Sequence, residues 1–108
     1  LTILATVVST PTKNRAIIDA GSKVLTSDLF GMNDHGAAVN FPELRITQLT
    51  EEHGTIVSEQ NTNLVIGQKI EIIPNHACVV TNMLNEVNLI TEEKKIKKVK
   101  VIARGKVW

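Results

Sequence analysis

The feature that most constrains the fold of this chain is a series of short runs, rich in β-branched residues, that turn residues separate. Two of these runs, residues 43–49 and 69–73, alternate apolar and polar side chains, as half-buried strands do. No stretch carries an apolar face that repeats every 3.6 residues, and only residues 79–84 suggest a short helical turn. The expected strands are residues 3–8, 15–19, 23–25 (a short continuation), 43–49, 54–58, 69–73, 86–90 and 98–102.

This pattern predicts an all-β fold, a small β-barrel or sandwich-like domain with short helical turns. Residues 28–40 have little pattern and are expected to form a loop. The 108 residues are enough for one domain with its own core and too few for two. Because the chain begins with Leu1 and its only methionines are Met32 and Met83, we expect residues 1–108 to be a single domain cut from a longer protein.

Composition argues against nucleic-acid and membrane partners. The formal net charge is +1, so no strong field attracts either partner. The lysines of residues 92–100 suit a hairpin turn and a guarded edge strand, and the aromatic residues Phe30, Phe41 and Trp108 are too few for a base-stacking surface. The apolar opening, residues 1–8, is too short to span a membrane and lacks the basic flank of a signal peptide. With a single cysteine and no internal disulfide, these features predict a cytoplasmic location.

The only cysteine, Cys78, lies two residues after His76 and just beyond a strand-like run. A neutral imidazole and a thiolate can together hold a divalent metal such as zinc. On an extended backbone both side chains point to the same face, whereas on a helix they diverge by roughly 200°. No second His/Cys cluster exists, so these two ligands fit only an open site that other groups complete. The alternative is a small buried thiol beside a loop histidine.

A second polar cluster, Glu52 and His53 within residues 51–54, precedes a predicted strand. A carboxylate beside an imidazole can orient the ring or raise its pKa, but a solvated turn explains the same residues. His35 is expected to be a loop residue. A nucleophilic pair formed by His76 and Cys78 is disfavoured, because two residues of separation leave little room for a substrate between them.

Four segments occur in order along the chain: residues 15–23 (RAIIDAGSK), 51–54 (EEHG), Gly67 with 72–78 (IIPNHAC), and 103–105 (ARG). Together they make the chain resemble the C-terminal β-domain of the D-serine dehydratase and D-threonine aldolase family, which are pyridoxal-phosphate enzymes of the alanine-racemase fold type. The resemblance spans residues 15–105, and the Pro-Asn-His-x-Cys piece is its most specific part.

The resemblance implies that an N-terminal (β/α)8 barrel, missing here, carries the Schiff-base lysine and binds the pyridoxal phosphate, so that this chain itself has no cofactor-binding residue. It implies that His76 and Cys78 are the metal ligands and that a second subunit completes the site. Glu52 and His53 are candidates to line or brace that site. Asp19 and Lys23 match a family motif, and we expect them to be structural, as an ion pair at a turn.

The resemblance implies that this chain is the metal-binding domain of a lyase acting on β-hydroxy-D-amino acids. The cysteine at position 78 favours a dehydratase over an aldolase, and it favours zinc as the metal. No lysine here is assigned as the Schiff-base residue, so we predict no turnover by this chain alone. One alternative is a structural β-module for dimer formation without a functional metal, and another is a racemase-like enzyme. Because N-terminal residues often add strands to this domain, we also expect an unpaired edge and self-association.

Overall fold

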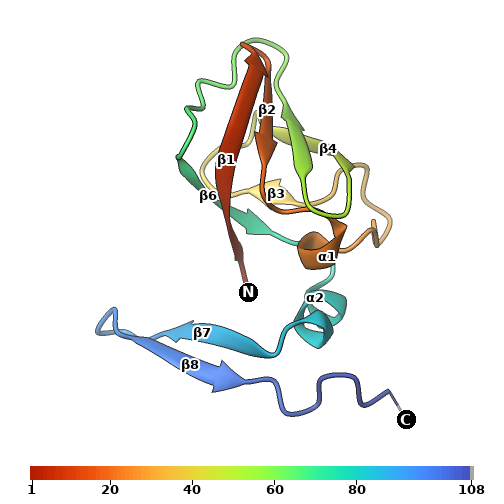
Figure 1. Cartoon of the computed structure of the whole chain (residues 1–108), viewed down its shortest axis with the longest axis vertical. Helices are drawn as coiled ribbons and strands as arrows, with labels where there is room; N and C mark the ends of the chain where they lie inside the picture. Colours follow the sequence, from red (N-terminus) through yellow and green to blue (C-terminus); the bar gives the residue numbers. More distant parts are fainter. Residues whose placement is uncertain (108) are drawn as a thin grey trace.

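The computed structural model describes residues 1–107, in which strand β1 (Ile3–Thr12) organises the larger sheet. β1 pairs antiparallel with β2 (Arg15–Ile18) on one side and with β6 (Lys69–Ile73) on the other. The strand order β1-β2-β5-β4-β3-β6 closes into a barrel (Figure 1). The remaining strands of the barrel are β3 (Ala37–Ala38), β4 (Arg45–Leu49) and β5 (Gly54–Val57). Trp108, at the end of the expected domain, lies outside the described residues.

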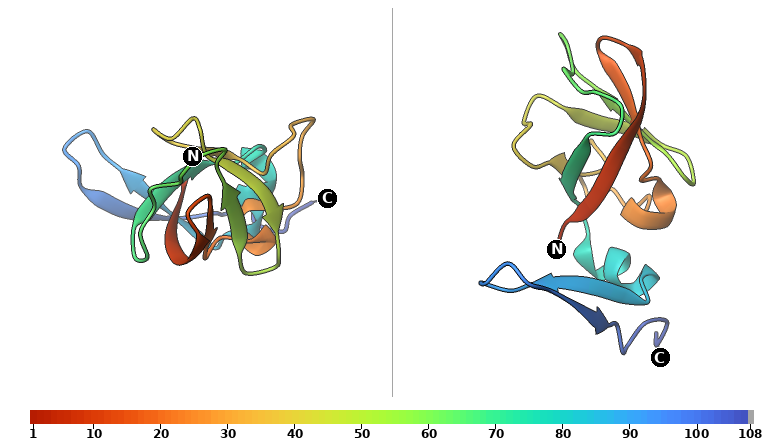
Figure 2. Two further views of the ribbon diagram at one scale, coloured as in Figure 1. Left: turned by 90° about the horizontal axis from the view of Figure 1, so that it is seen from above. Right: turned by 60° about the vertical axis from the view of Figure 1, so that its left-hand side comes forward.

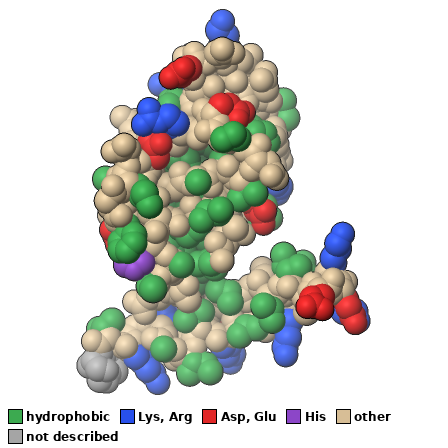
Figure 3. Space-filling view, turned by 180° about the vertical axis from the view of Figure 1, so that it is seen from behind, with side chains coloured by type: hydrophobic (Ala, Val, Ile, Leu, Met, Phe, Trp, Pro, Cys, Tyr) green, Lys and Arg blue, Asp and Glu red, His purple; other side chains and the backbone are tan. Residues whose placement is uncertain are grey.

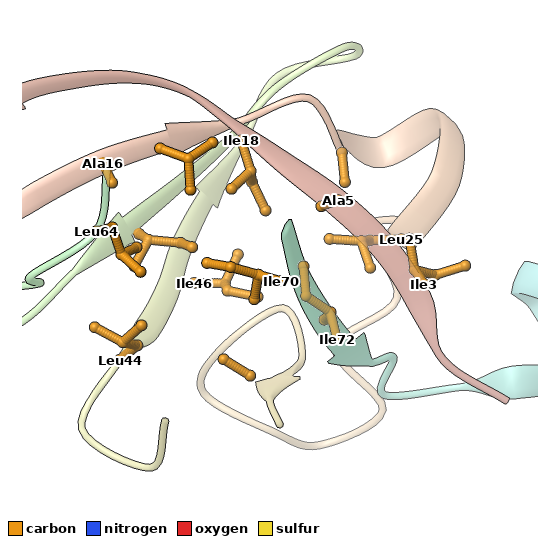
Figure 4. Packing of buried hydrophobic residues seen from close by; sticks show 14 of the residues in the cluster. Ile3, Ala5, Ala16, Ile18, Leu25, Leu44, Ile46, Leu64, Ile70 and Ile72 are labelled. Atoms are coloured by element: carbon orange, nitrogen blue, oxygen red, sulfur yellow. The ribbon is translucent and has the colours of Figure 1, made fainter. Parts of the chain in front are cut away.

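Alternation along the strands fills the barrel with aliphatic side chains. On β6, Ile70 and Ile72 are buried, whereas Lys69, Glu71 and Ile73 are exposed. The close view of the core shows inward side chains from opposite walls meeting in the centre (Figure 4). The largest fully buried side chains are Ile18, Leu25, Ile46, Ile56, Ile70, Ile72, Val7 and Val80. The predicted all-β barrel is therefore confirmed.

Helix α1 (Ser22–Leu25) replaces the strand that was predicted over residues 23–25, and that prediction was wrong. A run of three residues is too short to show a period, so tertiary contacts decide its conformation. The backbone N–H of Ser22 donates to the carbonyl of Thr50, and a Cβ added at Gly21 would lie 2.4 Å from that same oxygen. Only glycine allows this close approach, which turns the chain into a helix and buries Leu25.

Helix α2 (Ala77–Met83) confirms the helical turn predicted near residues 79–84, although it begins two residues earlier. Most of residues 28–40 form the expected loop, which contains the short strand β3. Within residues 1–107 no helix has the length and apolar character needed to cross a membrane.

The C-terminal hairpin stands apart from the barrel. Strands β7 (Glu86–Ile90) and β8 (Ile96–Lys100) form their own two-stranded sheet beyond α2 (Figure 2). The strand predicted over residues 98–102 is thus shifted toward the lysine-rich turn. Closure pairs each barrel strand on both sides, so the expected unpaired edge is wrong for the barrel and is found at the hairpin. The expected self-association stays a prediction.

Candidate functional site

The candidate ligands lie where β6 ends and α2 begins. Pro74 is buried and ends the strand, and His76 is the N-cap residue of α2 with extended backbone angles of φ −137° and ψ 94°. Cys78 lies in the first turn of the helix. The backbone is therefore extended at His76 and helical at Cys78, so neither simple geometry considered from the sequence applies. Cys78 is exposed, and the alternative of a small buried thiol is wrong.

One ring nitrogen of His76 is already engaged. Its Nδ1 lies 2.7 Å from Oδ2 of Asp28, and its ring centroid is 4.5 Å from that of Phe30. The hydrogen bond to His76 is the main reason that the pKa of Asp28 lies below its usual value, and the N–H of Phe30 adds to the effect. The side chain of His76 is 27% exposed, so the ring is held by contacts yet is reachable.

The loop that carries Asp28 is tied back to the same junction. Nδ2 of Asn75 donates to the carbonyl oxygens of Leu29 at 3.2 Å and Asp34 at 2.6 Å. Oδ1 of Asp28 accepts the backbone N–H of Phe30 at 2.9 Å. The residue next to His76 thus holds the loop, and the loop holds the imidazole.

Cys78 faces different surroundings from His76. It lines an open hollow of about 380 Å³ between α2 and the segment that follows β8, together with Ala77, Thr81, Asn82, Val101 and Ala103. The following segment is fixed to α2, because the N–H of Gly105 donates to Oδ1 of Asn82 at 2.8 Å. The thiol is therefore accessible from a surface of the domain.

The described part of the chain supplies at most two metal ligands at this junction. Residues 1–107 contain no group of three or more His, Cys, Asp or Glu side chains placed to hold an ion. The donor set still fits a zinc-like metal, because imidazole and thiolate are its common ligands and Nδ1 of His76 already has a carboxylate partner. A metal held by this pair would need its further ligands from outside these residues.

Glu52 and His53 lie in an exposed turn beside α1. Glu52 forms an ion pair with Lys23, which is the main cause that lowers the pKa of Glu52. The N–H of His53 donates to the hydroxyl of Thr50 at 3.1 Å. No hydrogen bond or ion pair among residues 1–107 joins this turn to His76, although α1 packs beside α2. Their predicted role at the site stays a prediction.

Asp19 and Lys23 do not pair with each other, so that expectation was wrong. Oδ1 of Asp19 accepts the backbone N–H of Thr6 at 2.7 Å across the β1–β2 pair, while Lys23 pairs with Glu52. Both residues are nevertheless structural, as expected. Sequence reasoning missed Asp28, because it lies 48 positions from His76 in a loop without pattern.

Solved structures identify the type of domain. The D-threonine aldolase from Filomicrobium marinum matches with a TM-score of 0.84 and 28% identity, over 99% of this chain and 29% of that one. D-threo-3-hydroxyaspartate dehydratase from Delftia sp. HT23 shares the fold, with a TM-score of 0.80 at 21% identity over 92% of this chain and 31% of that one. Two variants of a D-threo-3-hydroxyaspartate dehydratase match as well, with TM-scores of 0.77 and 0.74. In one a histidine, and in the other a cysteine two positions later, is replaced by alanine, the second in the metal-free form.

The architecture is thus that of the C-terminal β-domain of D-threonine aldolase-like and D-serine dehydratase-like proteins, and this chain spans about 30% of such solved chains. The family model "Putative serine dehydratase domain" matches residues 1–90, and the chain belongs to this family.

Curated relatives agree with that assignment. An uncharacterized protein of Mycobacterium tuberculosis is 36% identical over 112 residues, which cover 98% of this chain and 84% of the relative. The D-serine dehydratase of Dictyostelium discoideum is 34% identical over 108 residues, covering 87% of this chain and 27% of that enzyme. The domain therefore forms most of one relative and about a quarter of the other.

Proposed function

We propose that this chain is the metal-binding C-terminal domain of a pyridoxal-phosphate-dependent lyase that acts on β-hydroxy-D-amino acids, with dehydration favoured over aldol cleavage. The observation that carries the proposal is an accessible thiol, Cys78, two residues from an imidazole, His76, whose Nδ1 is held by a carboxylate. Family membership and the likeness to the Dictyostelium D-serine dehydratase support the enzyme class.

Two variants of a D-threo-3-hydroxyaspartate dehydratase give further support for the ligand pair. The substituted histidine and cysteine have the spacing of His76 and Cys78, and the cysteine variant is described in the metal-free form. A thiolate ligand suits a soft metal, so zinc is the expected ion.

The residues of this chain define what the site contributes. His76 and Cys78 would bind the metal and leave positions open for water and for the hydroxyl of a substrate. A metal bound there supplies a Lewis acid that stabilises negative charge on the departing oxygen. Cofactor binding and removal of the α-proton belong to the barrel domain, so the chain alone is expected to be inactive. The expected partners of this chain are that barrel, a second subunit and a small D-amino-acid substrate. The expected location is the cytoplasm.

Cobalt(II) titration of the chain tests the proposal. We expect a thiolate-to-metal charge-transfer band in the near ultraviolet, which Cys78→Ser abolishes and His76→Ala strongly weakens. His53→Gln tests the candidate role of His53: an unchanged band shows that His53 is not a ligand, and a weakened band shows that it is. In the full-length enzyme, retention of both metal and activity by the His76→Ala and Cys78→Ser variants would refute the proposal.

A dimerisation module without metal is the second candidate, and the exposed hairpin favours it. Ile90 and Ile96 are a cross-strand pair with 65% and 71% of their surfaces exposed. Hydrophobic side chains lie among lysines on this part of the molecule (Figure 3). Sedimentation at high concentration should then show self-association, and a clean monomer contradicts this candidate. A racemase-like enzyme, by contrast, would keep its activity under a metal chelator.

A further inference from the structure

We infer that Asp28 is a positioning residue for His76, fixing the imidazole tautomer that leaves Nε2 free to bind the metal. This inference rests on the proposed function and adds to it a residue outside the ligand pair. Asp28 lies in the loop between α1 and β3, far from His76 in sequence, and meets it only in the folded domain.

The tautomer follows from the hydrogen bond. An ionised carboxylate only accepts, so the 2.7 Å contact between Oδ2 of Asp28 and Nδ1 of His76 requires the proton to lie on Nδ1. In the neutral ring Nε2 then carries the lone pair, which is the form that ligates a metal. Metal-binding histidines in proteins commonly have such a carboxylate on the other nitrogen.

Nε2 is also available. No hydrogen bond among residues 1–107 involves Nε2 of His76. In the same range, the only buried side-chain nitrogen or oxygen without a partner is Nδ1 of His35, so Nε2 of His76 is not buried. A ring with one nitrogen bonded to a carboxylate and the other unbonded and accessible has the arrangement of a metal-binding histidine.

The carboxylate is itself fixed, so it can aim the ring. Oδ1 of Asp28 accepts the backbone N–H of Phe30, and the ring of Phe30 lies beside the imidazole at an interplanar angle of 33°. Asn75 fastens the same loop through the carbonyl oxygens of Leu29 and Asp34. Rotation of the His76 ring would therefore break the bond to Asp28 and the contact with Phe30 together.

Asp28→Asn separates positioning from a merely structural role. Asparagine has nearly the same shape, and its oxygen can still accept the N–H of Phe30. Its Nδ2 is a donor, however, so it requires a lone pair on Nδ1 of His76 and moves the proton to Nε2. A loss of loop structure alone would not reverse the tautomer in this way.

The experiment combines two readouts on the 108-residue chain. Nitrogen-15 NMR of the imidazole ring without metal should show the proton on Nδ1 in the wild type and on Nε2 in Asp28→Asn. Cobalt(II) titration should show a Kd about 10–100-fold higher for the variant. Asp19→Asn is the matched control, because the carboxylate of Asp19 accepts the backbone N–H of Thr6 outside this loop and an asparagine oxygen can accept the same N–H, so it should change neither readout.

The outcomes separate this inference from the proposed function. If the wild type binds cobalt through Cys78 but Asp28→Asn keeps the wild-type tautomer and affinity, the inference is overturned and the proposed function stands. If the wild type shows the Nδ1 proton but neither the chain nor the full-length enzyme binds cobalt, the proposed function fails and the inference fails with it. A changed tautomer with weakened binding supports both.

Discussion

Replacing Asn75 by alanine tests whether side-chain hydrogen bonds hold the loop of residues 26–36 against the candidate ligand. Nδ2 of Asn75 donates at 2.6 Å to the carbonyl of Asp34 and at 3.2 Å to that of Leu29. Asn75 is half-buried, so water replaces these bonds only in part. The same loop is also held by the ion pair between Asp34 and Arg45 and by the N–H of His35, which donates to the carbonyl of Ile46.

The expected cost follows from those two bonds. A hydrogen bond between uncharged groups contributes about 0.5–1.5 kcal/mol to the free energy of unfolding, so losing both should cost about 1–3 kcal/mol. The shorter bond to Asp34 should supply the larger share. Because the same loop brings Asp28 to His76, we also expect the Kd for cobalt(II) to rise by up to about tenfold.

Urea denaturation followed by circular dichroism measures the first effect, and cobalt titration measures the second. Asn88→Ala is the control, because Asn88 lies on exposed strand β7 and makes no side-chain hydrogen bond within residues 1–107. Unchanged unfolding free energy in Asn75→Ala would show that other contacts hold the loop. Reduced stability with unchanged cobalt affinity would instead show that the loop is held by Asn75 but does not orient His76.

Two further results should follow from the structure. Ile46→Ala, at a fully buried barrel position, should lower the free energy of unfolding by about 2–5 kcal/mol, measured by urea denaturation, whereas a change below 1 kcal/mol would show that the core repacks. The pKa of Asp28 is lowered in the folded state, so its contribution to stability is present above its unfolded pKa and is lost as the pH falls below about 4. Asp28→Asn should therefore flatten the stability curve in that acidic range, and an unchanged curve would contradict this reasoning.

The sequence was sufficient to predict the barrel because burial alternates along its strands. On β6 the buried Ile70 and Ile72 flank the exposed Glu71. This alternation of apolar and polar residues is the period of two that a half-buried strand requires. The residues of α1 carried no such information, since its helical turn depends on the close approach of Gly21 to the carbonyl of Thr50. Contacts between segments decided the conformation there, and a local pattern does not contain them.

The candidate site was predictable only in part, for the same reason. His76 and Cys78 are neighbours in sequence, so their spacing was visible, and so was the proline that ends the strand before them. The change from extended to helical backbone between them was not visible, because the helical turn was expected to begin one residue after Cys78. Asp28 was out of reach altogether, since only folding brings it to the imidazole.

Under the proposed function, two ligands come from this chain and the other groups of the metal site come from outside it, and this division has a physical reason. A closed barrel with a filled aliphatic core can hold His76 in a set orientation before any metal binds, because its partner Asp28 and the loop come from the same domain. A site with four protein ligands would be closed to substrate, whereas two ligands leave positions for a hydroxyl and for water. Under the proposed function, the fold supplies orientation and the open positions supply reactivity. Under the same proposal a neighbouring domain brings the substrate to the metal, so we expect activity only from the assembled enzyme.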